Sequence, residues 1–208
     1  MGMNRDLRQR LIDMADQDQR TRAELSADGS PYEDYHPRIQ ALHEEHAALF
    51  ATILDQHGWP GESLVGNAGA EASWLIVQYA ISRPELQQRA LTALQQAVRD
   101  GEAPAWQSAM LLDRVSVFQG KRQVYGTELH WDRTGELCPR PMENPDEVDR
   151  RRASVGLRPL AEAVAQQRAV AARRGERPQT PFDQRQAAFE AWAEKTGWRE
   201  REPQPIDG

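Results

Sequence analysis

The stretch that decides the fold is residues 37–57, which read PRIQALHEEHAALFATILDQH. Apolar side chains recur there at intervals of three and four residues, which is the period of an amphipathic α-helix. The stripe consists of Ile39, Leu42, His46, Leu49 and Ile53, widened by His43, Phe50 and Leu54. Gly58 and Pro60 follow at once and are typical of a helix end. The stretch therefore predicts a helix that packs its apolar side against other helices.

The same period continues on both sides of this stretch. It predicts further helices over residues 4–25, 67–81, 82–101, 104–118, 144–156, 159–167 and 181–200. Residues 61–66 are expected to form a loop, with Asn67 capping the helix that follows. Ser82-Arg83-Pro84-Glu85 is a capping box with proline in the first helical turn, so another helix begins there.

Around residue 125 the period changes from that of a helix to that of a strand. Apolar and polar residues alternate from Tyr125 to Trp131, and Asp132 to Gly135 form a turn signal. Residues 136–142 can return antiparallel, and Pro139 and Pro141 favour an edge strand. We therefore expect one short β-hairpin near residues 121–142.

These elements predict a mainly α protein. We expect a compact, bundle-like helical domain over residues 4–170, a linker over residues 171–180 and a C-terminal helical appendage over residues 181–200. The last helix carries the aromatic side chains Phe182, Phe189 and Trp192, with Trp198 close behind. It is expected to dock on the main domain or on a second subunit, so a homodimer is possible.

Composition narrows the class of protein. The chain has 208 residues and a net charge of −6, which argues against a nucleic-acid partner. Its longest apolar run, Trp74 to Val77, is far too short to cross a membrane, and the N-terminus lacks the apolar core of a signal peptide. Cys138 is the single cysteine, which suits a reducing compartment. We therefore expect a soluble, cytoplasmic protein that contacts neither membrane nor nucleic acid.

Four ionisable residues interrupt the apolar stripes: Asp18, His43, His46 and Asp113. Periodicity directs each of them toward the interior, where an unpaired charge costs several kcal/mol. They are our candidate catalytic residues: a histidine would act as acid or base, and an aspartate would orient it. The candidate substrate-binding residues are Arg22, Arg114, Gln78, Tyr79, Tyr125 and Glu128.

This interpretation predicts an enzyme that uses acid–base chemistry on a small polar or anionic metabolite, such as a hydrolase, lyase or cyclase. Arg22 lies one helical turn after Asp18, and either Arg22 or Arg114 would bind an anionic group. Tyr125 and Glu128 would line the entrance. The alternative is a buried polar network that only fixes the register of the helices.

Two other functions stay open. A non-catalytic interaction protein would use the aromatic C-terminal helix to cover a partner helix. A metal-dependent helical-bundle enzyme would use His43 and His46, three residues apart, together with Asp18 and Asp113. The spacing is not that of the zinc proteases, whose histidines lie four apart. We assign no metal ligand, and the sequence indicates no particular cofactor.

An ordered set of motifs resembles a bacterial family catalogued as domain of unknown function 6624. The motifs are Asp18-Gln19-x-x-Arg22, His57-Gly58-Trp59-Pro60, Ser63-Leu64-Val65-Gly66, Trp74-Leu75-Ile76-Val77-Gln78, Asp113-Arg114, Tyr125-Gly126-Thr127, and Val148-Asp149-x-x-Arg152 before Gly156-Leu157. The likeness extends from about Leu7 to Ala165. The resemblance implies no agreed activity. It includes His43 among the matched positions, and it places Tyr79, Glu128 and His46 where the family usually has His, Gln and Asn.

Overall fold

The structure is a computed structural model that describes residues 2–27 and 36–200. By its internal contacts the chain divides into two compact units, residues 1–111 and 112–208, and the boundary falls within one helix. The mainly α prediction with a single two-stranded hairpin is confirmed for the described residues. None of their helices is both long and apolar enough to span a membrane.

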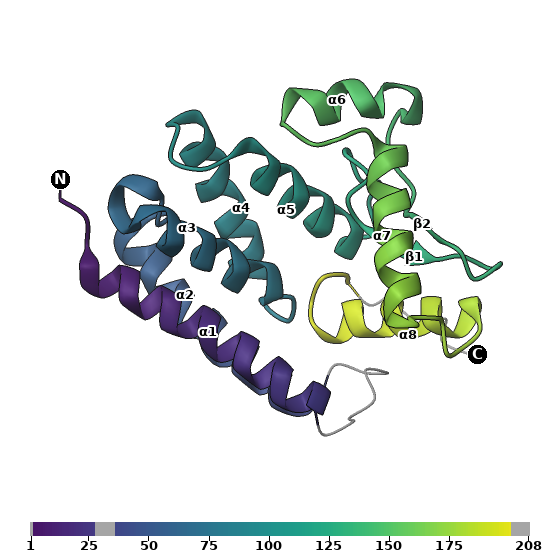
Figure 1. The fold of residues 1–208 in the computed structure, drawn as a ribbon, viewed down its shortest axis with the longest axis horizontal. Helices are drawn as coiled ribbons and strands as arrows, with labels where there is room; N and C mark the ends of the chain where they lie inside the picture. The colour runs from purple at the N-terminus through teal and green to yellow at the C-terminus, as the bar shows by residue number, and fades with distance from the viewer. Residues whose placement is uncertain (1, 28–35, 201–208) are drawn as a thin grey trace, which may run out of the picture. The chain divides into compact units, whose positions relative to one another are not determined.

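Unit 1 is built from helices (Figure 1), and apolar side chains are buried between them. Its elements are α1 (Arg5–Ala27), α2 (Pro37–His57), α3 (Glu62–Tyr79), α4 (Pro84–Arg99) and the first part of α5 (Ala105–Phe118). Helix α1 packs along α3 and α2, and α2 also contacts α3 and α4. Leu11, Phe50 and Leu94 are completely buried between these helices. The apolar stripes of the sequence therefore form the core, as periodicity predicts.

Helix α3 begins earlier than predicted, because residues 62–65 form a helical turn instead of a loop. The N-terminus of this turn is capped from a distance: the Glu102 carboxylate accepts a hydrogen bond from the Ser63 amide at 2.8 Å. A cap supplied from 39 residues away leaves no local signal in the sequence. The chain bends at Gly66, whose φ of 68° and ψ of 168° are accessible almost only to glycine.

Unit 2 contains the hairpin and the remaining helices. Its elements after α5 are β1 (Leu129–Trp131), β2 (Leu137–Pro139), the 3₁₀ helix η1 (Pro145–Glu147), α6 (Val148–Ser154), α7 (Leu160–Arg174) and α8 (Phe182–Lys195). The strands are antiparallel, with Leu129 opposite Pro139 and Trp131 opposite Leu137. The predicted strand from Tyr125 is wrong for residues 125–128, because their amides bond to side chains and not to a neighbouring strand.

The aromatic side chains at the C-terminal end of the described chain pack inside unit 2. The Phe118 ring, at the end of α5, lies 5.9 Å from Phe189, 5.0 Å from Trp192 and 5.1 Å from Trp198. Arg199 adds hydrogen bonds from its guanidinium to the carbonyls of Val117 and Phe118. Helix α8 therefore has an apolar attachment within its own unit, which gives these side chains partners without a second protein.

Replacing Gly66 by alanine is expected to destabilise unit 1 by about 1–3 kcal/mol, because alanine must adopt a backbone conformation that its Cβ opposes. The free energy of unfolding, measured by chemical denaturation, gives the cost. Gly2→Ala is the matched control, since Gly2 has no positive φ and no atom within 4 Å of an added Cβ. Equal stability of the Gly66→Ala protein and the wild type would contradict the kink.

Candidate functional site

The predicted site residues lie in two groups, each within one unit. Unit 1 holds Asp18, Arg22, His43, His46, Gln78 and Tyr79, and unit 2 holds Asp113, Arg114, Tyr125 and Glu128. The four residues that interrupt the apolar stripes are all buried, as predicted: their exposed fractions are 4% for Asp18, 3% for His43, 4% for His46 and 0% for Asp113. The structure thus contains two buried polar clusters with different chemistry.

In unit 1, α1 and α2 bring Asp18 and His43 together. The Nε2 atom of His43 lies 2.5 Å from Oδ1 of Asp18, and Nε of Arg22 donates to Oδ2 of the same carboxylate at 2.7 Å. Burial alone would raise the pKa of Asp18, but the hydrogen bonds from His43 and Arg22, with the charge of Arg22, hold it below its ordinary value. Asp18 is therefore ionised at neutral pH, and Nε2 of His43 carries the proton shared with it.

Tyr79, on the last turn of α3, joins this pair. Its ring stacks on the His43 imidazole with centroids 4.9 Å apart and an interplanar angle of 11°. The guanidinium carbon of Arg22 lies 4.1 Å from the centre of the same ring. Nη2 of Arg22 is 3.4 Å from Nε2 of His43, and the Arg22 side chain is about one-third exposed at 32%. Stacking and the cation–π contact fix the orientation of the imidazole.

His46 follows His43 by three residues on α2 and has a weaker set of contacts. Its Nε2 atom lies 3.4 Å from Oε1 of Gln17 on α1. Burial lowers the pKa of His46, the charge of His43 lowers it further, and Glu45 and Asp18 act in the opposite direction. His46 is therefore neutral at pH 7. Gln78, next to Tyr79 on α3, is half-buried.

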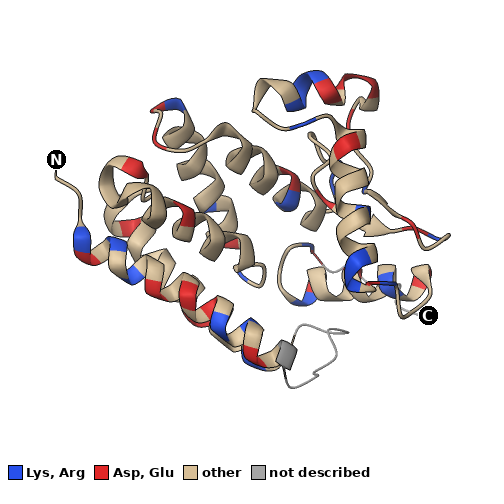
Figure 2. Ribbon diagram, in the orientation of Figure 1, with Lys and Arg blue, Asp and Glu red and all other residues tan. Residues whose placement is uncertain are grey.

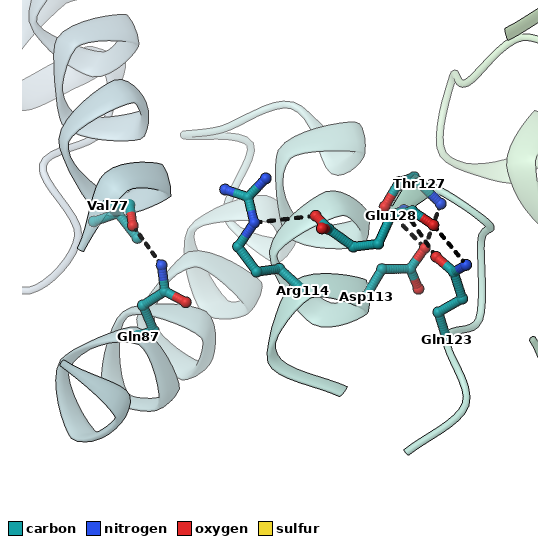
Figure 3. A network of polar contacts seen from close by, with 7 residues as sticks. All are labelled: Val77, Gln87, Asp113, Arg114, Gln123, Thr127 and Glu128. Carbon is teal, nitrogen blue, oxygen red and sulfur yellow. Dashed lines mark hydrogen bonds and ion pairs between the residues drawn. The ribbon is translucent and has the colours of Figure 1, made fainter. Parts of the chain in front are cut away.

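In unit 2, the buried Asp113 carboxylate holds the loop 124–127 (Figure 3). Its Oδ1 accepts hydrogen bonds from the amides of Val124 at 2.7 Å and Tyr125 at 3.0 Å. Its Oδ2 accepts from the amide and the hydroxyl of Thr127, both at 2.9 Å. Four donors from one loop satisfy this buried charge, and Asp113 thereby determines the course of the backbone.

Arg114 and Glu128 form an ion pair beside this loop, with Nε of Arg114 3.0 Å from Oε1 of Glu128. Both side chains are largely buried, at 20% and 17% exposed. The backbone of Glu128 is fixed by Gln123, which accepts from its amide at 2.9 Å and donates to its carbonyl at 3.0 Å (Figure 3). Gln123 thus fixes the backbone from which the Glu128 side chain reaches Arg114. A role of Arg114, Tyr125 and Glu128 in substrate binding stays a prediction.

Three buried side chains outside the predicted site residues, Gln123, Arg152 and Gln87, donate hydrogen bonds to backbone carbonyls distant in the sequence. Gln123 is completely buried and also donates to the Arg140 carbonyl at 2.7 Å. Arg152, 3% exposed, donates from Nη1 to the Tyr125 carbonyl and from Nε to the Arg158 carbonyl, both at 2.6 Å. Burial lowers the pKa of Arg152, against the opposite effect of Asp149 and Asp113.

The third is Gln87 on α4, which donates to the Val77 carbonyl at 2.8 Å (Figure 3). Its Oε1 is a buried acceptor for which the described residues supply no donor. In the sequence, Gln87 interrupts the apolar stripe of Leu86, Ala90 and Leu94. This interruption was the signal that could have predicted a buried amide. Arg152 gave the same signal beside Val148. Neither Gln87 nor Arg152 lies near a histidine in the sequence, and neither was therefore among the predicted site residues.

Within residues 2–27 and 36–200, no three side chains of His, Cys, Asp or Glu are arranged as a set that could hold a metal ion. The buried acids of both clusters are instead occupied by nitrogen and hydroxyl donors of the protein.

Residues 5–173 match the model of a family described as a family of unknown function, DUF6624. The match covers most of the chain, so the protein belongs to this family, and the resemblance found in the sequence is confirmed. Neither curated proteins nor solved structures gave a match. Both polar clusters lie within the matched residues, whereas helix α8 lies beyond them.

Replacing Asp113 by asparagine is expected to destabilise unit 2 by about 2–4 kcal/mol, because an amide group would face the Thr127 donors. Unfolding by denaturant measures the loss. Asp132→Asn is the matched control: this carboxylate accepts the same kinds of bond from Thr134 and Glu136, but in an exposed turn. A larger loss for the control than for Asp113→Asn would contradict the proposed loop anchor.

His46 is expected to titrate below about 6.5 in an NMR experiment on the histidine rings. A folded-state pKa below the unfolded value means that neutral His46 stabilises the fold above about pH 6.5, and that this contribution is lost as the pH falls below it. The pH dependence of unfolding should therefore be shallower between about pH 5 and 6.5 in His46→Gln than in the wild type. A His46 midpoint above 6.5 would contradict the expectation that burial outweighs the charges of Glu45 and Asp18.

Proposed function

We propose that unit 1 carries an acid–base catalytic centre for a small polar or anionic metabolite. His43 is the proton-transferring group, Asp18 orients it, and Arg22 binds an anionic group of the substrate. The supporting observation is the buried contact of 2.5 Å between His43 Nε2 and an Asp18 carboxylate that also binds Arg22. Hydrolases, lyases and cyclases all require such a proton transfer.

The protonation of this pair supports the assignment. Because Asp18 is ionised and holds the proton on Nε2, the basic nitrogen of neutral His43 is Nδ1. A carboxylate that fixes the tautomer and stabilises the imidazolium is the arrangement used by catalytic histidines in unrelated folds. The charge of Arg22 balances that of Asp18 while the imidazole is neutral, and the adjacent Asp18 carboxylate stabilises the imidazolium formed in the proposed proton transfer.

Neighbouring groups complete the proposed centre. Tyr79 stacks on the imidazole and holds its plane, and the partly exposed guanidinium of Arg22 gives an anionic substrate a cation. Neutral His46 is a second group able to exchange a proton, and Gln78 is assigned to substrate binding. The lone cysteine is a weaker nucleophile candidate, because burial raises the pKa of Cys138. A cytoplasmic location fits that single thiol.

The test is a panel of small carboxylates and phosphate esters incubated with the wild-type protein and analysed by NMR for products. On any converted compound, His43→Gln and Asp18→Asn are expected to lower kcat by about 10²–10⁴-fold, since general acid–base catalysis contributes that much. Arg22→Gln is expected to raise KM more for anionic than for uncharged compounds. Glu24→Gln is the matched control, because it removes an exposed ion pair with Arg38 in the same two helices.

Two results would overturn the proposal. One is wild-type turnover in both His43→Gln and Asp18→Asn, with circular dichroism confirming that the proteins are folded. The other is a panel in which the wild type converts nothing and no compound shifts the ring resonances of His43. Retention of activity in the Glu24→Gln control is required, since this residue lies outside the proposed centre.

A further inference from the structure

Unit 2 contains a hollow that the proposed acid–base function does not use. It lies between the β-hairpin and the C-terminal end of α7 and has a volume of about 310 Å³. That volume is at the lower end of the range of small-molecule sites in proteins. Gly135 at the hairpin turn and Gly175 at the end of α7 line its two sides.

The register of the hairpin explains why the inner wall is apolar. Trp131 and Leu137 are opposite one another, so both side chains lie on the same face of the two strands. This face lines the hollow, together with Ala172 of α7. The neighbouring residue His130 points to the other face, where its ring lies 5.8 Å from Phe182 of α8. The inner wall of the hollow therefore consists of the Trp131 indole ring and the aliphatic side chains of Leu137 and Ala172.

Arg177 is a rim cation for which residues 2–27 and 36–200 supply no ion-pair partner. Arg168 pairs with Glu136 at 3.2 Å and donates to the Leu137 carbonyl at 2.8 Å. Glu176 pairs with Arg174 at 3.5 Å. Arg177 also lines the hollow, and no described residue forms an ion pair with it. Figure 2 shows this concentration of basic residues at the C-terminal end of α7. A guanidinium that is not engaged by the described part of the chain suits a ligand with one negative charge.

We propose that this hollow binds a one- or two-ring aromatic carboxylate. The ring packs on Trp131 and Leu137, and the carboxylate accepts hydrogen bonds from Arg177. An aromatic face favours a planar apolar body. A guanidinium matches the two oxygens of a carboxylate. The size of the hollow limits the ligand to a small molecule. This assignment is independent of the acid–base centre in unit 1, and neither needs the other.

The test uses 1-naphthoate as the probe and its neutral amide, 1-naphthamide, as the uncharged analogue. Titration is followed by the ¹H–¹⁵N resonance of the Trp131 indole in the full chain. The expected result is a saturable shift of this resonance with naphthoate. Arg177→Gln should weaken naphthoate binding by about tenfold, the effect of losing a charged hydrogen-bond partner, and leave naphthamide binding unchanged. For the two Trp131 variants, which lack this indole, binding is followed by the ¹H resonances of the ligand itself. Trp131→Leu should abolish binding of both ligands, whereas Trp131→Phe should retain it.

Arg173→Gln is the matched control, since Arg173 is exposed on the same helix end but does not line the hollow. The proposal is overturned if the Trp131 resonance does not shift up to about 10 mM naphthoate, a concentration beyond weak specific binding. It is also overturned if Arg173→Gln and Arg177→Gln weaken binding equally, which indicates unspecific charge attraction. If naphthamide binds the wild type as tightly as naphthoate, the proposed recognition of the carboxylate by Arg177 is overturned.

Discussion

A carboxylate that is removed from water has to find hydrogen-bond donors inside the protein, and this constraint determines the polar interior of both units. Asp18 is 4% exposed and Asp113 is completely buried. Each is placed on an otherwise apolar helix face, where an unsatisfied charge would cost more than a typical domain can tolerate. The surrounding structure is therefore arranged to supply donors: two side chains for Asp18, and a complete loop for Asp113.

The difference between these donors separates chemistry from architecture. The donors to Asp113 are mainly backbone amides, which neither titrate nor leave without unfolding the loop. The donors to Asp18 are an imidazole and a guanidinium, and an imidazole changes its charge near neutral pH. A carboxylate bound by titratable side chains can take part in proton transfer, whereas one bound by amides fixes a backbone. This is why the proposed function is assigned to Asp18 and not to Asp113.

Sequence periodicity was sufficient to predict that the helices exist and that the four interrupting residues are buried. Both follow from the apolar stripe of each helix. The spacing of four residues likewise predicted that Arg22 lies one helical turn from Asp18, beside it. Periodicity could not predict which buried residues meet: His43 reaches Asp18 across 25 positions, and Tyr79 reaches His43 from a third helix. The early start of α3 depended in the same way on Glu102. Contacts of this kind depend on how the helices pack, and a single helix pattern contains no information about that.

The architecture around Asp113 connects several of the motifs noted in the sequence. Asp113 bonds to the loop that carries Tyr125-Gly126-Thr127, and Arg152 bonds to the Tyr125 carbonyl of the same loop. Gly126 has a φ of 69°, which favours glycine, and a Cβ there would lie 2.9 Å from a methyl group of Leu160. Three separate sequence motifs thus describe one hydrogen-bonded loop. Arg114 follows Asp113 on the helix and faces about 100° away. Asp113, which anchors the loop, thereby also determines how the Arg114 side chain is directed toward Glu128.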